Sequence, residues 1–251
     1  MIRLSAHLVL ICLGLAASAD AGPTVLFIAV DDLNDWVGVL GGHPQARTPN
    51  IDRLAASGLL FANAHCAAPA CNPSRTAVFT GLAPNRSGLY RNRQKMRQVL
   101  PRAELLPKYF TRHGYHSSGS GKMLHYFIDA DSWDEYYPAR KTENPFPSHM
   151  QWGKRPKSLP RAGPWQYTET DWHAFDVTDE QFGGDYRVTE WVSEQLSRQH
   201  DKPFFIACGI YRPHEPWYAP KKYFDLLRRK VPMFGAWSGC ADPYRPLHTG
   251  G

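Results

Sequence analysis

The sequence has no apolar run long enough to cross a lipid bilayer. The apolar run at its very beginning is short and falls below the usual length of a membrane-spanning helix. It also lacks the residue patterns of zinc fingers and of RNA-reading or DNA-reading domains. No segment has the composition of a disordered chain. These absences argue against a membrane channel and against a sequence-reading nucleic-acid protein. The 43% hydrophobic content suffices for one substantial core or two modest ones.

The first 19 residues have the features of a secretory signal peptide. Arg3 precedes an apolar run over 8–15, and Ala17-Ser18-Ala19 matches an A-x-A cleavage site. We therefore expect cleavage after Ala19 or Ala21 and an exported, periplasmic or extracellular product without stable membrane insertion. The formal charge of +6 favours anionic partners. For an exported protein, we expect a sulfated small molecule or glycan rather than nucleic acid.

The stretch from Cys66 to Gly81 carries the strongest chemical signal. Pro73 suits the first turn of a helix, and Gly81 suits the residue that closes it, so we predict a helix over 73–80. Cys71 would lie just before this helix, where the helix dipole lowers a thiol pKa and attracts an anion. Arg75 follows one turn later and could contact the same anion. The alternative is an ordinary buried cysteine before a capped helix.

Two carboxylates follow the first predicted strand, a continuous apolar run over 24–30. Ligands of open α/β sheets gather at the carboxyl ends of the strands, so Asp31 and Asp32 are candidate oxygen ligands for a hard divalent cation. A solvated strand end is the alternative. After this strand we predict a helix over 48–58, with an apolar stripe of Ile51, Leu54 and Ala55, and a short strand over 59–64.

Further predicted elements end in polar side chains. A helix over 107–113 precedes a strand from Tyr115 into a glycine-rich turn with Lys122 and His125. A helix over 185–199 covers the sheet, and a strand over 203–210 leads to His214 in a proline-rich loop. A surface lysine and incidental histidines are the alternative interpretation. The segment 129–176 has no sustained period, so we expect a long irregular excursion whose tryptophans pack on their own scaffold.

The motifs together resemble the type I sulfatases, and their N-terminal portion in particular. The matching residues are Cys71, Pro73, Ser74 and Arg75 in C-x-P-S-R, Thr80-Gly81 after it, T-P-N-I-D-x-L-A-x-x-G at 48–58, the pair Asp31-Asp32, and G-K-x-x-H ending at His125. R-P-H-x-P-W around His214 resembles the iduronate-2-sulfatase-like branch. A chance match to all of these motifs in the family's order is very improbable.

The resemblance implies a sulfuric ester hydrolase acting on a sulfated sugar or related ester. Cys71 would be converted to formylglycine by a formylglycine-generating enzyme, and its hydrate would attack sulfur. Asp31, Asp32 and residue 71 would hold Ca²⁺, with Mg²⁺ as an alternative. Lys122 and His214 would bind the sulfate, Arg75 and Lys122 would stabilise charge, and His125 would help to regenerate the aldehyde. Modification would leave Cys66, Cys208 and Cys240, so we expect at most one disulfide.

The implied fold is α/β, an alkaline-phosphatase-like sandwich of a mostly parallel sheet between helices, incomplete at the C-terminus. We expect residues 22–227 to form part of a sulfatase N-terminal catalytic domain. The tail 228–251 is atypical and lacks the later aspartate and lysine motifs of the family. We read this as truncation or a frameshift of a longer enzyme. The alternatives are an inactive protein that binds sulfated glycans, or a phosphatase or phosphonate hydrolase of the same fold.

Overall fold

The computed structural model describes residues 22–125, 127–138, 172–215 and 217–227. The expected signal peptide and the atypical tail lie outside these ranges, as do Trp152 and Trp165. Within them, no helix is both long and apolar enough to cross a membrane.

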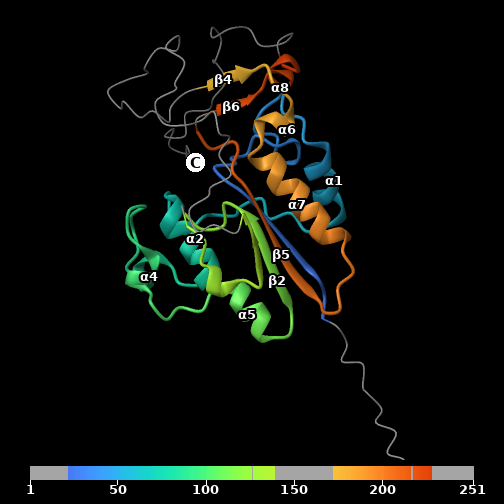
Figure 1. The fold of residues 1–251 in the computed structure, drawn as a ribbon. Coiled ribbons are helices and arrows are strands. Elements are labelled where there is room, and N and C mark those ends of the chain that lie inside the picture. The colour runs from blue at the N-terminus through green and yellow to red at the C-terminus, as the bar shows by residue number, and fades with distance from the viewer. Residues whose placement is uncertain (1–21, 126, 139–171, 216, 228–251) are drawn as a thin grey trace, which may run out of the picture.

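The centre of the fold is a four-stranded, fully parallel sheet with the order β1-β5-β2-β3 (Figure 1). The strands are β1 (Val25–Val30), β2 (His116–Gly121), β3 (Glu135–Tyr137) and β5 (Phe204–Ile210). The sequence-based strands that begin near 24, 115 and 203 are thereby confirmed. Since β5 pairs with both β1 and β2, it brings together segments that are about 90 residues apart in the sequence.

The sheet is covered by helices on both faces. Alternate residues of β5 belong to two different core clusters, one on each face. Phe205 and Ala207 belong to one core cluster, whereas Ile206 and Cys208 belong to another on the opposite face. The second cluster is completed by Val188 and Val192 of α7 (Asp185–Ser197). Helix α7 therefore covers one face, as the helical spacing of its apolar residues predicts.

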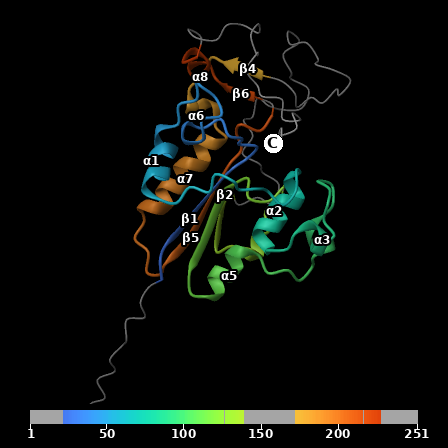
Figure 2. The same cartoon turned by 180° about the vertical axis from the view of Figure 1, so that it is seen from behind.

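The other face carries α2 (Cys71–Thr80) and α5 (Leu106–Arg112), with the short helices α3 (Pro84–Ser87) and α4 (Met96–Val99) beside them (Figures 1 and 2). Its core cluster contains Phe79, Leu89, Met96, Leu105, Met123 and Leu124. The ring of Phe205 stacks on that of Phe110 with centroids 4.5 Å apart. Parallel strands between two helical layers are the predicted α/β sandwich.

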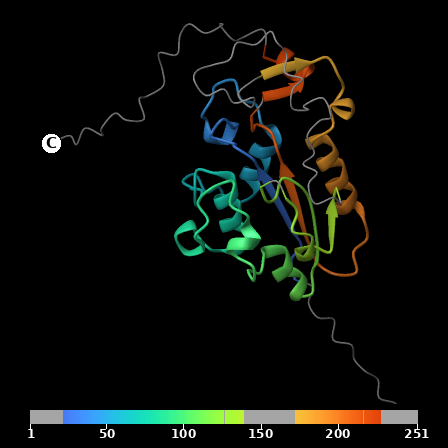
Figure 3. The same ribbon diagram turned by 60° about the vertical axis from the view of Figure 1, so that its left-hand side comes forward.

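A second, two-stranded parallel sheet lies beyond the carboxyl ends of the main strands (Figure 3). It consists of β4 (Trp172–Phe175) and β6 (Trp217–Pro220), flanked by α6 (Asp179–Phe182) and α8 (Lys221–Asp225). The segment 129–176 is therefore not wholly irregular, because it contributes β3, β4 and the 3-10 turn Ala130–Ser132. These strands are too short to give a periodic pattern. Trp133 packs against the main core, as expected.

Two apolar segments differ from expectation. The predicted strand over 59–64 does not form. Leu59, Leu60 and Phe61 are exposed, and the segment pairs with no described strand. Helix α1 (Pro49–Ser57) forms as predicted and packs beside the 3-10 turn Gly38–Leu40. Its predicted apolar stripe, however, includes the exposed Ile51 and Leu54. Strand β1 likewise forms an edge of the described sheet and exposes Leu26 and Ile28.

The ends of β2 and β5 approach so closely that only glycine fits. Gly121 has a φ of +79°, and a Cβ added there would lie 2.1 Å from the carbonyl oxygen of Gly209. A Cβ on Gly209 would in turn lie 2.5 Å from the backbone nitrogen of Lys122. This close contact determines the path of the backbone at the end of β2, and therefore the position of the Lys122 Cα atom from which the side chain extends.

The substitution Gly121→Ala should lower the free energy of unfolding by at least about 3 kcal/mol, through a left-handed backbone and an overpacked contact. Gly114→Ala is the matched control, because its φ is +86° but nothing lies within 4 Å of the added Cβ. That control should lose only about 1–2 kcal/mol. Urea unfolding of both variants measures the difference. Equal losses of unfolding free energy in the two variants would show that the close approach of β2 and β5 does not exclude a side chain at residue 121.

Candidate functional site

Parallel strand ends bring the candidate residues together. Asp31 follows β1 directly, Lys122 follows β2 directly, and His214 lies four residues beyond β5. The backbone nitrogen of Asp31 donates to the carbonyl of Ile210 at 2.9 Å, and that of Lys122 donates to the carbonyl of Gly209 at 3.0 Å. Strand β5 therefore holds both residues at the carboxyl edge of the sheet, where ligands of such folds bind.

Cys71 is the first residue of α2 rather than a residue just before the helix, because the cap is Ala70. Its Sγ lies 3.8 Å from Nζ of Lys122. The expected lowering of the thiol pKa is wrong. Burial raises the pKa of Cys71, and the nearby Asp31 carboxylate adds to the rise, while Lys122 opposes it. An unmodified Cys71 is consequently a protonated thiol at neutral pH and a poor nucleophile.

Asp31 is the electrostatic centre of the site. One carboxylate oxygen accepts a hydrogen bond from Nη2 of Arg75 at 2.5 Å, and the other accepts one from Nζ of Lys122. Asp31 and Lys122 are both buried, with 6% and 1% of their side chains exposed. Burial alone would raise the pKa of Asp31, but the two cations outweigh it and leave the pKa below its ordinary value. The carboxylate is therefore ionised at neutral pH.

Arg75 pairs with the Asp31 carboxylate and also binds the backbone directly after β2. Its Nη1 donates to the carbonyl oxygens of Lys122 and Met123, directly after β2. We expected the guanidinium to turn back toward an anion beside Cys71. In the structure its donors instead join the end of β1 to the turn after β2. The spacing of four residues thus predicted proximity but not direction.

His214 faces both carboxylates across the site. Its Nε2 lies 4.0 Å from Oδ2 of Asp31 and 3.8 Å from Oδ2 of Asp32. Asp32 has a φ of +53° and its side chain is 54% exposed, so it lies at the rim. Its neighbour Asp31 is buried. The predicted convergence of Asp31, Cys71, Lys122 and His214 is thus present in the structure, with Asp32 at its border.

Sequence reasoning missed the residues that orient His214. The hydroxyl of Tyr211 lies 3.1 Å from Nδ1 of His214, and the two rings are 4.7 Å apart. The Asp185 carboxylate accepts the backbone N–H groups of Tyr211 and Arg212, at 2.7 and 2.9 Å. Tyr211 stands three residues before His214, which was a usable signal. Asp185 was visible only as the first residue of a predicted helix.

His125 lies within the electrostatic reach of the same cluster. Burial, together with the nearby Lys122 and Arg75, lowers the pKa of His125 to about 4, although Asp31 opposes them. The imidazole is therefore neutral at physiological pH. The neutral imidazole adds no third positive charge beside the two cations. It can accept a proton only transiently, because burial and both cations disfavour its charged form.

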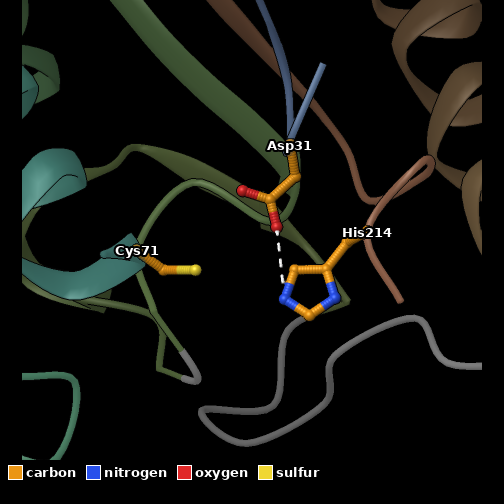
Figure 4. Close-up of side chains that lie close together, drawn as sticks. All are labelled: Asp31, Cys71 and His214. Carbon is orange, nitrogen blue, oxygen red and sulfur yellow. Dashed lines mark ion pairs between the residues drawn. The ribbon is translucent and has the colours of Figure 1, made fainter. Parts of the chain in front are cut away.

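The donor groups fit a divalent cation in part. One ligand atom each from Asp31, Cys71 and His214 lies within 4.8 Å of the others, and Figure 4 shows the three side chains directed toward a common space. Calcium prefers six to eight oxygen ligands. The Asp31 and Asp32 carboxylates are of that type, whereas the thiol and imidazole suit softer metals. Replacing the sulfur of residue 71 with oxygen would add a further oxygen ligand of the kind that calcium prefers.

The free cysteines are the three in the described ranges, namely exposed Cys66, half-buried Cys71 and buried Cys208. Cys208 packs in the core beside α7, as expected. Burial raises its pKa to about 11, so it is inert. Among the described cysteines, only Cys71 combines partial burial with charged neighbours.

Asp31→Asn should lower the free energy of unfolding by about 3 kcal/mol, because it removes the buried carboxylate with which both Lys122 and Arg75 pair. Asp32→Asn is the matched control, since that side chain is mostly exposed and asparagine tolerates a positive φ. The control should change stability by less than about 0.5 kcal/mol. Chemical denaturation of both variants measures the contrast, and similar losses would contradict it.

The difference in stability between wild type and Asp31→Asn should depend on pH. The folded-state pKa of Asp31 lies below the ordinary value of 3.8, so its contribution is complete above that pH and is lost as pH falls through the folded value. The stability gap between wild type and Asp31→Asn should therefore narrow in acid. A gap that stays constant down to the acid limit of folding would show that Asp31 is not the titrating group.

The chain matches the sulfatase family model over residues 23–235. It is 41% identical over 211 residues to a sulfatase of Formosa agariphila, covering 81% of this chain and 41% of that protein. It is 30% identical to human iduronate 2-sulfatase, covering 86% and 40%. It is also 30% identical to mouse N-acetylgalactosamine-6-sulfatase, covering 88% and 46%. The iduronate-2-sulfatase-like branch is thus not singled out, and the chain spans less than half the length of these relatives.

Solved structures agree on the fold. Ps i-CgsB in complex with a neocarrahexaose aligns with a TM-score of 0.59 at 26% identity, over 83% of this chain and 49% of that one. BT4656 with its substrate D-glucosamine-2-N,6-O-disulfate aligns with a TM-score of 0.60 at 19% identity, over 89% and 40%. The architecture, the carboxyl-edge site and the family match lead to one conclusion. The chain belongs to the sulfatase family.

Proposed function

We propose that the protein hydrolyses sulfate esters of sugars, with residue 71 as the nucleophile after its conversion to formylglycine. The observation that carries this proposal is the common space bordered by Cys71, Asp31 and His214, into which the Lys122 ammonium also reaches. A space bordered by one buried cation and one imidazole suits a tetrahedral anion. Residues 22–227 would form part of the catalytic domain.

A sugar substrate is supported by what the similar proteins are described to bind. Ps i-CgsB is in complex with a neocarrahexaose, and BT4656 with a disulfated glucosamine. Human iduronate 2-sulfatase and mouse N-acetylgalactosamine-6-sulfatase are named for sulfated sugars. The net charge of +6 also favours an anionic ligand. We infer a sulfated sugar as the substrate class for this chain.

Asp31 and Asp32 would hold a divalent cation, Ca²⁺ or else Mg²⁺, together with an oxygen of residue 71. When bound, the cation would withdraw electron density from the sulfate oxygens. Oxygen donors are what such a cation prefers, which is a physical reason for the oxidation of Cys71. Asp31 is already ionised in the structure because Arg75 and Lys122 lower its pKa.

The other residues would act on the sulfate and on protons. Lys122 would bind a sulfate oxygen, since its ammonium is 3.8 Å from Sγ of Cys71. Arg75 would contribute positive charge while holding Asp31 and the turn after β2 in place. His214, fixed by Tyr211, would bind the sulfate or protonate the departing alcohol. Neutral His125 would accept a proton from residue 71 when the sulfate leaves.

Maturation requires a formylglycine-generating enzyme, which we propose as the protein's processing partner. The raised pKa of the Cys71 thiol supports this requirement, because an unmodified thiol would be largely protonated and unreactive at neutral pH. We also propose that the protein acts outside the cytoplasm, in the periplasm or extracellularly. The support is the apolar segment and A-x-A site within residues 1–19.

Mass spectrometry of the peptide containing residue 71 tests the nucleophile. After co-expression with a formylglycine-generating enzyme, we expect this peptide to lose one sulfur and two hydrogens and to gain one oxygen. The peptide containing Cys66 should keep its encoded mass, and the variant Cys71→Ala should lack sulfatase activity. Full activity with an intact thiol at residue 71 would contradict the proposed nucleophile.

Turnover of an aryl sulfate and of the matching aryl phosphate separates the competing functions. We expect protein with converted residue 71 to prefer the sulfate ester by at least about tenfold in kcat/KM, a difference of about 1.4 kcal/mol between transition states. A preference for phosphate would instead support the phosphatase or phosphonate hydrolase alternative. Binding of sulfated sugars without any turnover would support the inactive binding protein.

A further inference from the structure

A second positively charged feature lies next to the site. The segment between α3 and α4 folds into a tight loop, and its outer surface contains a shallow hollow lined by Tyr90, Arg91, Arg93 and Gln94. The side chains of Tyr90, Arg91 and Arg93 are exposed. None of these residues belongs to the catalytic cluster described above.

The loop is held in one shape by hydrogen bonds of its own. The side-chain oxygen of Gln94 accepts the backbone N–H groups of Tyr90 and Arg91, at 2.7 and 2.8 Å. The amide nitrogen of Gln94 donates to the carbonyl of Gly88 at 3.1 Å. On either side of the hollow, Leu89 and Met96 are buried in the core. Binding at this loop would therefore require little ordering of the backbone.

The loop is also fastened to the residue beside the nucleophile. Asn72 is buried, and its side-chain nitrogen donates to the carbonyl oxygens of Arg91, Asn92 and Gln94, at 3.2, 3.2 and 2.7 Å. Its backbone N–H donates to Oδ1 of Asn92 at 2.9 Å. Figures 1 and 2 show the segment between α3 and α4 lying next to the N-terminal end of α2. The loop that carries the hollow is thus joined by Asn72 to the helix turn that begins with Cys71.

The arginines of the hollow have no acidic partner among the described residues. Two other arginines of this region do have one, because Arg97 pairs with Asp129 and Arg112 pairs with Glu104. No described carboxylate lies within ion-pair distance of Arg91 or Arg93. Two guanidinium groups on a preformed surface, beside an exposed tyrosine ring, can bind an acidic sugar through charged hydrogen bonds and ring stacking.

We propose that this hollow is a binding subsite for a sulfate or carboxylate group on a sugar unit adjoining the one held at residue 71. This inference rests on the proposed sulfatase function. It makes the substrate an acidic oligosaccharide or polysaccharide rather than a small monosulfate. Arg91 and Arg93 bind the anionic group of the neighbouring unit, and Tyr90 packs against its ring.

Equilibrium binding tests the subsite without requiring turnover. In the inactive Cys71→Ala protein, the dissociation constant for a fully sulfated heparin hexasaccharide is compared between two double variants. Arg91→Ser with Arg93→Ser should weaken binding by at least about tenfold, since charged hydrogen bonds are lost. Arg53→Ser with Arg102→Ser removes the same charge from exposed arginines elsewhere and should weaken binding by less than about threefold.

Three results would overturn the subsite. The first is an equal loss of affinity in both double variants, which would indicate general attraction to a basic protein. The second is equally strong competition by a single-stranded DNA oligonucleotide of matched charge, which would indicate a nucleic-acid surface. A desulfated hexasaccharide should bind much more weakly than the sulfated one, and equal affinity for both would contradict recognition of anionic groups.

Kinetics on protein whose residue 71 is converted to formylglycine separate this proposal from the proposed function. The Arg91 and Arg93 double variant should raise KM for a sulfated oligosaccharide several-fold more than KM for an aryl sulfate. Absence of aryl sulfate hydrolysis by wild type would count against the sulfatase function alone. In that case the binding contrast between the two double variants would still decide for or against the subsite.

Discussion

The site depends on the pairing of the buried Asp31 carboxylate with Arg75 and Lys122. Each of these three charges would be costly to bury alone, and together they join the end of β1, helix α2 and the turn after β2. The backbone of β5 fixes the positions of Asp31 and Lys122 through the hydrogen bonds to Ile210 and Gly209. Charge balance and strand pairing therefore determine one arrangement of the side chains at the carboxyl edge of the sheet.

The sequence predicted those parts of the fold that depend on local signals. Strands β1 and β5 form at the continuous apolar runs, and α1 and α2 end at Gly58 and Gly81, as predicted. Only β5 is buried on both faces, because β1 lies at the edge of the described sheet. The residues after each strand were then expected at one edge because parallel strands share a direction. This reasoning correctly placed Asp31 and His214 at one edge, whereas Lys122 was linked to them through the family resemblance.

Properties that arise from contacts between distant segments could not be predicted in this way. The direction of the Arg75 guanidinium depends on carbonyl groups about 47 residues away in the chain, and the raised pKa of Cys71 depends on burial by other segments. The roles of Asn72 and Asp185 depend on backbone groups that the sequence does not reveal. Apolarity alone was misleading at 59–64, where the described structure offers no partner strand.

The position of β1 at the edge of the sheet that the described residues form bears on how this chain behaves in solution. An edge strand with exposed apolar side chains, here Leu26 and Ile28, can serve as a template for pairing with a neighbouring molecule. The opposing influence is mutual repulsion between molecules of formal charge +6. Added salt screens that repulsion but leaves the apolar edge unchanged. Colloidal stability of this chain should therefore be greatest in dilute, low-ionic-strength buffer well below its isoelectric point of about 9.1.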